Sequence, residues 1–403
     1  MSKKTLLFVP FVLLGACANG GKTTTPQSDV QISAMHHLFS FRSLTGFGTF
    51  PVPGTAVLST RSTLNLFADS TYTLTDSNGT SSPDRYALAN DGTLSIYISG
   101  TPTLIYRGAY SLNGTQADLQ FTDRVSTNSS PSVGLFYGTR IVSGQVELEG
   151  GWHLLSLHTV LAASNATLAY NNVGRGAHGG VAITAGAPGA QRTLSGTGVQ
   201  SVGLTMAINL TFGGTIQNLL DANNVGDGSC NLDVSYTPDG QAVDDRPMLS
   251  AANDNIVFGL DSDESDGEAG VLFLVRKFDA PTTPVDSVRV LGTFLVGGHT
   301  LFVNPSNSGS DAFVGVVTLG QQNAFRLDAT GSSGADFAYS GTYTLAADGG
   351  MTISIPATNE TWFAAIDRNY NTFVFVDDVI ESRSNSASEL NLGFGVREKA
   401  TTP

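Results

Sequence analysis

Short runs of alternating polar and apolar residues fill the chain, and pairs that favour tight turns separate them. The runs at 70–75, 93–98 and 351–355 show the alternation, with Thr, Tyr, Leu and Ile among their residues. A period of two puts such side chains on opposite faces of an extended chain in turn, so each run predicts a β-strand with one buried face. Asp91-Gly92 and Asp348-Gly349 favour the positive φ of hairpin turns. The sequence therefore predicts an all-β fold of antiparallel hairpins.

The composition excludes several other classes of protein. The chain has 403 residues, 46 of them Gly, and its hydrophobic content of 41% excludes wholesale disorder. Only the segment 214–222 is compatible with a short helix. The 34 acidic and 20 basic residues give a net charge of −14, and without a basic cluster a nucleic-acid partner is not expected. Two cysteines are too few for a disulfide scaffold.

Part of the sequence is repeated at a constant spacing. Residues 86–98 align without gaps with residues 343–355, seven of the thirteen positions are identical, and the offset is 257. The same offset relates two further pairs, Leu38 with Leu295 and Arg140 with Arg397. A constant offset across about 100 residues indicates a duplicated domain.

A third, divergent copy is predicted between these two. Its hairpin is assigned to 236–240 and its last strand to 271–276. The predicted domain organisation is a unit at 32–143, a second at 144–279 and a third at 285–400, with a linker at 280–284. Each unit would hold about eight short antiparallel strands, and such a sheet closes into a small barrel or folds into a sandwich because open edges promote aggregation. Both architectures are compatible with the sequence.

The N-terminus carries an export signal. Two lysines precede an apolar segment at 6–14, which is too short to span a bilayer as a helix. The motif Leu14-Gly15-Ala16-Cys17 resembles the lipobox of bacterial lipoproteins. The resemblance implies that the signal peptide 1–16 is removed and that Cys17 is acylated, with palmitate as the expected chain, and anchors the protein to a membrane. Residues 17–31 are predicted to be a flexible tether.

The lipoprotein resemblance also implies a location. Ala18 follows the acylated cysteine, and in that family this residue implies sorting to the outer membrane. The expected location is the bacterial outer membrane, with the folded units facing the periplasm or the cell surface. The expected partners are the membrane, through the anchor, and either a small apolar ligand or an envelope protein.

Aromatic and arginine residues recur at the ends of the units. The middle unit opens with Gly-Gly-Trp152 and ends with Arg276, and the third opens with Gly-Thr-Phe294 and ends with Arg397. This pattern resembles the lipocalin (calycin) family, and the resemblance implies a barrel in which the arginine packs on the aromatic ring and closes one end. A guanidinium over a ring gains a cation–π contact. In the first unit, Arg140 would have His37 as its counterpart.

Two acidic loops are candidate metal sites. The first has Asp261, Asp263, Glu264 and Asp266, and the second has Asp221, Asn223 and Asp227. Neighbouring carboxylates repel one another, and Ca²⁺ relieves this repulsion while accepting six to eight oxygen ligands. The alternative is a pair of solvated hairpin tips whose charge keeps the protein soluble. No other cofactor is expected.

Motifs that would identify an enzyme are not found in the sequence. There is no Gly-x-Ser-x-Gly elbow, no phosphate-binding loop and no zinc-protease helix motif, and the Gly-rich run 174–180 is predicted to be a flexible loop. Cys230 is expected to be a buried small residue, although an unpaired thiol in an exported protein can also be reactive. No catalytic residue is assigned, and the protein is expected to be non-enzymatic.

Three functions remain open at the level of sequence. The first is a cell-envelope lipoprotein that binds a small or apolar ligand inside a barrel or a partner through its loops. The second is a structural or adhesive surface lipoprotein, stabilised by Ca²⁺, without a ligand cavity. The third is an envelope enzyme that uses acids such as Asp377 or Asp378. A wide interior lined by small residues favours the first function, and an interior filled by bulky side chains favours the second.

Overall fold

The computed structural model of the chain is almost entirely β. It describes residues 28–43, 57–97, 104–112, 118–123, 133–141, 143–144, 146–160, 174–187, 189–202, 205–223, 225–238, 244–261, 268–304, 307–331, 334–379 and 389–399. Helical structure in this part of the chain comprises α1 (Ser287–Val290) and the 3₁₀ turn η3 (Gln321–Asn323). No helix there is long and apolar enough to cross a membrane. The predicted all-β fold is confirmed.

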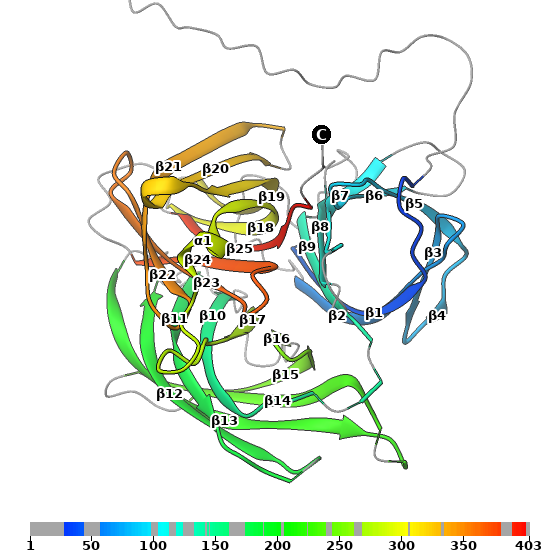
Figure 1. The fold of residues 1–403 in the computed structure, drawn as a ribbon, viewed down its shortest axis with the longest axis horizontal. Helices are drawn as coiled ribbons and strands as arrows, with labels where there is room; N and C mark the ends of the chain where they lie inside the picture. The colour runs from blue at the N-terminus through cyan, green and yellow to red at the C-terminus, as the bar shows by residue number, and fades with distance from the viewer. Residues whose placement is uncertain are drawn as a thin grey trace, which may run out of the picture.

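The first unit, which we call barrel 1, is a ring of antiparallel strands (Figure 1). Its strands are β1 (Ala34–Ser43), β2 (Val57–Leu66), β3 (Thr71–Asp76), β4 (Gly79–Thr80), β5 (Asp84–Leu88), β6 (Thr93–Tyr97), β7 (Leu104–Tyr110), β8 (Asp118–Asp123) and β9 (Val133–Arg140). The strand order is β2-β1-β9-β8-β7-β6-β5-β3-β4, and the additional pairing of β2 with β3 closes the ring.

The other two units, barrels 2 and 3, are closed antiparallel barrels in which each strand pairs with its neighbours in sequence. Barrel 2 has β10 (Gly150–Val160), β11 (Gly174–Ile183), β12 (Arg192–Val202), β13 (Thr205–Leu220), β14 (Gly226–Pro238), β15 (Asp244–Ala252), β16 (Ile256–Asp261) and β17 (Glu268–Arg276). Barrel 3 has β18 (Gly292–Asn304), β19 (Asn307–Leu319), β20 (Ala324–Gly331), β21 (Asp336–Leu345), β22 (Gly350–Ile355), β23 (Glu360–Ile366), β24 (Thr372–Val379) and β25 (Glu389–Arg397). The three tandem β units are barrels rather than sandwiches.

The short helix considered for 214–222 is wrong, because β13 runs through this segment. Ile216 and Asn218 point into barrel 2 and are buried, whereas Leu219 is exposed. Burial thus alternates as in a strand, and the sequence hides this because the buried residue 218 is polar and the exposed residue 219 is apolar.

The repeated hairpin has the same structure in barrels 1 and 3. Tyr86 pairs with Ile96, and their counterparts Tyr343 and Ile353 pair in the same register. Both turns place a glycine at positive φ, +98° at Gly92 and +91° at Gly349. Only glycine fits at position 92, because a Cβ there would lie 2.8 Å from the Tyr110 carbonyl oxygen.

The middle copy of this hairpin was assigned one turn too late. The segment 236–240 begins at the end of β14 and precedes β15, so two strands of barrel 2 follow the hairpin that it would form. Three strands follow the repeated hairpin in barrel 1 (β5 and β6) and in barrel 3 (β21 and β22), which makes β13 and β14 the equivalent pair in barrel 2. Turn composition of this kind suits any tight hairpin, so it does not identify which one is equivalent.

Each barrel is filled by its own apolar core, and the segment before its first strand contributes to that core. Val30 and Ile32 pack against the core of barrel 1, Val146 and Leu148 belong to the core of barrel 2, and Val285 packs against the core of barrel 3. Ser28 is buried too, and the amides of Asp29 and Val30 donate to the Leu88 carbonyl. The predicted tether at 17–31 therefore ends before Ser28, because alternating apolar residues begin at Val30.

A fourth apolar cluster joins the three barrels to one another. It is formed by side chains on their outer faces, among them Phe39 and Tyr137 of barrel 1, Phe258 and Phe273 of barrel 2, and Phe394 of barrel 3. The rings of Phe273 and Phe394 stack with centroids 5.3 Å apart, and the Tyr137 hydroxyl donates to the Gly259 carbonyl at 3.0 Å. The outer faces of these strands are therefore buried, and the three units form one body.

Candidate functional site

Arginine closes one end of barrels 2 and 3. The Arg276 guanidinium carbon lies 4.8 Å from the centroid of the Trp152 ring, and that of Arg397 lies 4.5 Å from the centroid of the Phe294 ring. Arg397 also donates to the carbonyls of Leu291 and Arg289 at 2.9 and 2.8 Å. Burial lowers the pKa of both arginines, although each keeps hydrogen-bond acceptors around its charge. The structure thus brings together the residues that the lipocalin resemblance paired.

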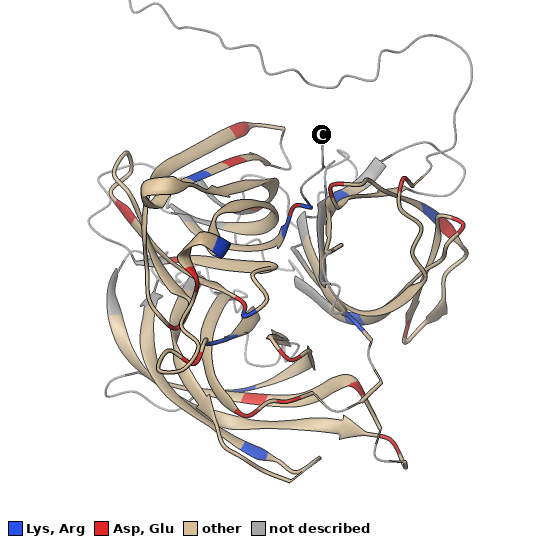
Figure 2. Ribbon diagram, viewed as in Figure 1, with Lys and Arg blue, Asp and Glu red and all other residues tan. Residues whose placement is uncertain are grey.

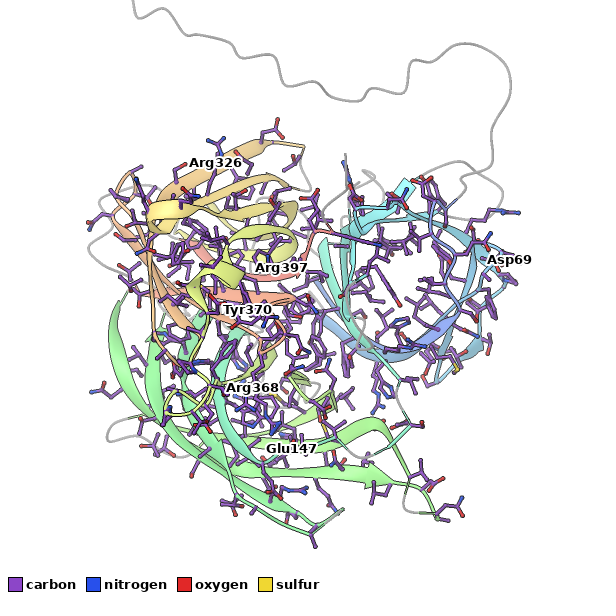
Figure 3. The ribbon with its side chains drawn as sticks, viewed as in Figure 1. Asp69, Glu147, Arg326, Arg368, Tyr370 and Arg397 are labelled. Carbon is purple, nitrogen blue, oxygen red and sulfur yellow. The ribbon has the colours of Figure 1, made fainter. Side chains whose placement is uncertain are left out.

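Position 292 requires glycine, because the Arg397 side chain lies directly against it. Gly292 has a φ of +145°, and a Cβ on it would overlap the Arg397 guanidinium. The main chain of Tyr370 accepts a hydrogen bond from Arg397 Nε, and Figure 3 shows the two residues close together beside α1. The glycine of the Gly-x-aromatic pattern therefore leaves room for the arginine.

The counterpart in barrel 1 is His36 and not His37. Arg140 is opposite His36 in the register of β1 with β9, as Arg276 is opposite Trp152. The His36 ring points inward, its Nε2 lies 3.2 Å from the Tyr110 hydroxyl, and burial lowers its pKa to about 3. The offset of 257 points to His37 because the pairing of the first and last strands differs by one residue between barrels 1 and 3.

His37 instead points outward and contacts barrel 2. Its Nε2 lies 2.8 Å from the Asp227 carbonyl oxygen, and its Nδ1 lies 3.1 Å from an Arg61 nitrogen. Arg61 also donates to the Ser229 hydroxyl. Asp227, predicted as a metal ligand, therefore lies at a polar contact between two barrels, where its carboxylate accepts from the Ser229 amide at 2.8 Å.

The residues of the two acidic loops lie in different surroundings. Asp261 is fully buried inside barrel 2 and is 3.1 Å from Arg246, and Asp221 is exposed and accepts from the amides of Asn223 and Val225. The other three, Asp263, Glu264 and Asp266, lie outside the described residues. Within the described part of the chain, no group of three or more His, Cys, Asp or Glu side chains is placed to hold a metal. A Ca²⁺ site remains a prediction.

The Gly-rich run 174–180 is not a loop but most of strand β11. Gly179 lies opposite Gly198 on β12, and a Cβ on either would come within 2.5 Å of the Phe212 ring. Small residues on these two strands thus make room for a large side chain from a third. Cys230 is also inside barrel 2, where it is a buried free thiol whose pKa burial raises to about 11.

The barrel interiors are occupied by bulky side chains. Barrel 3 alone buries Phe313, Phe325, Trp362, Phe373 and Phe375, and the rings of Trp362 and Phe375 stack at 5.2 Å. Asp377, considered as a catalytic acid, is fully buried in the same barrel beside Asn391, and the side chain of Asp378 lies outside the described residues. The described parts of the barrel interiors are therefore filled by side chains and do not form a wide ligand cavity.

A cleft of about 340 Å³, lined by both apolar and charged side chains, lies outside the barrels, where barrel 2 meets barrel 3. In Figure 1, β11 of barrel 2 runs beside β22–β24 of barrel 3, and β11 contacts β24. The cleft is lined by side chains from both barrels, including His153, His178, Lys277, Asp348 and Phe363. The His178 and Phe363 rings are stacked, with centroids 4.4 Å apart and planes inclined by 10°.

Charged groups in this cleft pair across the two barrels. Lys277 Nζ is 3.2 Å from Asp348 Oδ2, and His153 Nε2 is 3.1 Å from the Asp348 carbonyl oxygen. Burial lowers the pKa of His153 to about 4, so the ring is neutral at pH 7. Burial alone would raise the pKa of Asp348, but His153, the Gly350 amide and Lys277 outweigh it and the pKa is lowered. The cleft therefore has one paired positive and one paired negative charge.

Sequence reasoning did not find this cleft. Its residues are spread over six strands and two connecting segments of different barrels, and none forms a local motif. The glycines of β11 were the available signal, since two of them, Gly179 and Gly180, form part of the cleft wall.

Comparisons with known proteins find a limited likeness to one group of structures. No family model and no curated protein matches the chain. A point mutant of the vaccine antigen transferrin binding protein B from Haemophilus parasuis Hp5 is 10% identical with a TM-score of 0.29, covering 93% of this chain and 77% of that one. The isotype 1 protein from serogroup B Neisseria meningitidis is 10% identical with a TM-score of 0.28, covering 93% and 77%. Intact Ap-TbpB, with N and C lobes, is 8% identical with a TM-score of 0.26, covering 93% and 79%.

Proposed function

We propose that the protein is a non-enzymatic, lipid-anchored binding protein of the bacterial cell envelope, and that it recognises its partner with the outer surface of its barrels. The supporting observation is the contrast between the filled barrel interiors and a cleft with aromatic and charged side chains at the junction of barrels 2 and 3. Binding sites are usually concave, with a mostly apolar lining and a few convergent polar groups. Acidic and basic residues are dispersed over the strands, which suits a soluble body held beside a membrane (Figure 2).

The distance between the anchor and the body is set by the chain itself. Ten residues separate Cys17 from Ser28, the first described residue of barrel 1. Fully extended, this segment spans at most about 36–40 Å. Acylation at Cys17 would therefore hold barrel 1 close to the membrane surface.

The anchor is tested with Cys17→Ser. This variant lacks the acylated thiol, so it should leave the membrane fraction and appear as a soluble protein, while Cys230→Ser should stay with the membrane. Equal membrane association of Cys17→Ser and the native chain would contradict lipid anchoring.

The binding surface is tested by cross-linking in intact cells. A photoreactive phenylalanine analogue at Thr352, an exposed residue of the cleft, should give a discrete adduct, and the same analogue at the exposed Arg326 should not. Arg326 lies on barrel 3 away from the cleft (Figure 3). Equal cross-linking at the two positions, or none at Thr352, would contradict a partner site at the cleft.

A structural or adhesive role is the second candidate, because filled interiors are what such a protein requires. If Ca²⁺ stabilises it, millimolar Ca²⁺ should raise the melting temperature of the native chain by mass action. Asp221→Asn should reduce the shift. An unchanged melting temperature in Ca²⁺ would reject the metal-stabilised form of this candidate.

A further inference from the structure

We propose that the cleft between barrels 2 and 3 binds a neutral sugar ring. This inference deepens the proposed function and rests on it, because it assigns the chemistry of the ligand to the site already described. Three features of the cleft support it: a flat stacked surface, a neighbouring donor and acceptor of opposite charge, and walls made of glycine.

The flat surface is the stacked pair of His178 and Phe363. Phe363 comes from β23 of barrel 3 and His178 from β11 of barrel 2, and both side chains are partly exposed. A sugar ring has one face made mainly of C–H groups. Such an apolar face packs on the apolar surface of aromatic side chains. The edges and outer faces of the pair therefore contribute aromatic surface to the cleft beside its charged groups.

The donor and the acceptor are the ammonium group of Lys277 and the carboxylate of Asp348. They lie 3.2 Å apart, and their side chains are 28% and 30% exposed, so each can form further hydrogen bonds with a ligand. An ammonium group only donates hydrogen bonds and an ionised carboxylate only accepts them, whereas each sugar hydroxyl does both. Two adjacent hydroxyls match this pair.

The charge of the cleft favours a neutral ligand. The Lys277 and Asp348 charges cancel, and His153 is neutral because burial lowers its pKa to about 4. The net charge of −14 on the whole chain disfavours the approach of an anion. An organic cation would have to displace Lys277 from Asp348.

Glycine in the walls keeps the cleft open. A Cβ on Gly180 would lie 2.9 Å from Lys277 Nζ, and one on Gly350 would lie 2.9 Å from His153 Cε1. Gly180 thus lets the ammonium group reach Asp348. The volume of about 340 Å³ is at the lower end of the range for small-molecule sites, about 300–1,000 Å³, which suits one or two sugar rings.

The test is a titration with methyl glycosides of glucose, galactose, mannose and N-acetylglucosamine, followed by NMR of the histidine rings in the full chain without its signal peptide. At least one glycoside should shift the His178 ring signals in a saturable way, and those of His36, enclosed in barrel 1, should not move. His178→Ala and Gly180→Ala should each weaken binding at least tenfold, and Arg326→Ala should leave it unchanged. Phe363→Leu serves as the second wall variant if His178→Ala fails to fold.

The outcomes separate this inference from the proposed function. No saturable shift with any glycoside, or the same affinity in His178→Ala and Gly180→Ala, would overturn the sugar assignment. If cross-linking at Thr352 persists in that case, the binding function stands with a ligand of different chemistry. If that cross-link is also missing, both proposals fail.

Discussion

At the scale of single residues, His299 is a buried side chain without a hydrogen bond in the described part of the chain. It lies where barrel 3 meets barrel 1, its ring is edge-on to Phe41 at 5.1 Å, and neither ring nitrogen has a hydrogen-bond partner among the described residues. It is 1% exposed, and burial lowers its pKa from 6.5 to about 3. The protonated ring is therefore compatible with the unfolded chain but not with the folded one.

This burial makes stability depend on pH. Above pH 6.5 the ring is neutral in both states and contributes no dependence. Between pH 6.5 and about pH 3, the His299 ring is protonated in the unfolded chain and neutral in the folded chain. The free energy of unfolding therefore falls as the pH is lowered through this range. At pH 4.5 the loss from His299 is about 3 kcal/mol. His36 adds a loss in the same direction, because burial also lowers its pKa to about 3.

We expect His299→Leu to flatten the acid dependence. Urea denaturation at pH 7 and pH 4.5 should show a smaller difference than in the native chain, by about 3 kcal/mol. Phe41→Leu is the matched control, because it alters the same contact without a titrating group and should lower stability equally at both pH values. An unchanged pH difference in His299→Leu would show that the ring is accessible to protons.

Arg397 is expected to matter more than any exposed charge of barrel 3. Arg397→Ala leaves the carbonyls of Leu291 and Arg289 without their partner and uncovers the Phe294 ring, so it should destabilise the chain by about 2–4 kcal/mol in urea denaturation. Arg326→Ala, at an exposed side chain, should stay within about 0.5 kcal/mol. Equal stability of the two variants would refute closure of the barrel by arginine.

At the scale of secondary-structure elements, the glycines of β11 and β12 decide how barrel 2 packs. Gly198→Ala would place a methyl group in overlap with the His178 carbonyl oxygen and 2.5 Å from the Phe212 ring, and overpacking of this kind costs about 1–3 kcal/mol. Gly320→Ala is the control, because its Cβ would meet its nearest neighbour at 3.4 Å. Thermal melts should show a clear loss for the first variant and little change for the second. Similar melts would mean that Phe212 can move aside.

The elements that the sequence predicted are those whose signals are local. The hairpins at 86–98 and 343–355 combine alternation with an Asp-Gly turn, and both formed as expected. Strand β11 was missed because glycine has no side chain with which to show alternation. The pairing of His36 with Arg140 was missed because register between strands about 100 residues apart depends on packing across the whole barrel.

The candidate site was less predictable than the fold. The arginine and aromatic residues at the barrel ends share a recurring pattern, so the sequence reveals them. The cleft depends on how barrels 2 and 3 pack against each other, which is determined by outward-facing residues such as Leu155 and Val376. In the sequence, these residues cannot be distinguished from the apolar residues that fill a barrel. Alternation shows that a residue is apolar and does not show which neighbour covers it.

At the scale of the whole molecule, the cluster on the outer faces makes the three barrels depend on one another. Phe394 of barrel 3 lies 5.4 and 5.3 Å from the rings of Phe258 and Phe273 of barrel 2. A barrel taken from the chain would expose these rings to water. We therefore expect calorimetry of the full chain to show one cooperative transition rather than three.

Phe394→Ala tests this dependence. Loss of a buried phenylalanine costs about 3–5 kcal/mol, and the whole transition should move to lower temperature while remaining single. Phe325→Ala, inside barrel 3, provides the comparison for a core residue that does not touch another barrel. Separate transitions in the native chain, or a shift of only one of them in Phe394→Ala, would show that the barrels unfold independently.

The segment before β1 also has a mechanical consequence. If Cys17 is anchored as we propose, any pull between the membrane and the folded body enters at Ser28, whose hydroxyl accepts from the Leu88 amide at 3.1 Å. The next two residues hold the same strand, through the amides of Asp29 and Val30 on the Leu88 carbonyl. Load on the proposed anchor would thus be carried into the wall of barrel 1 by a few hydrogen bonds, and these would be the first to break under shear.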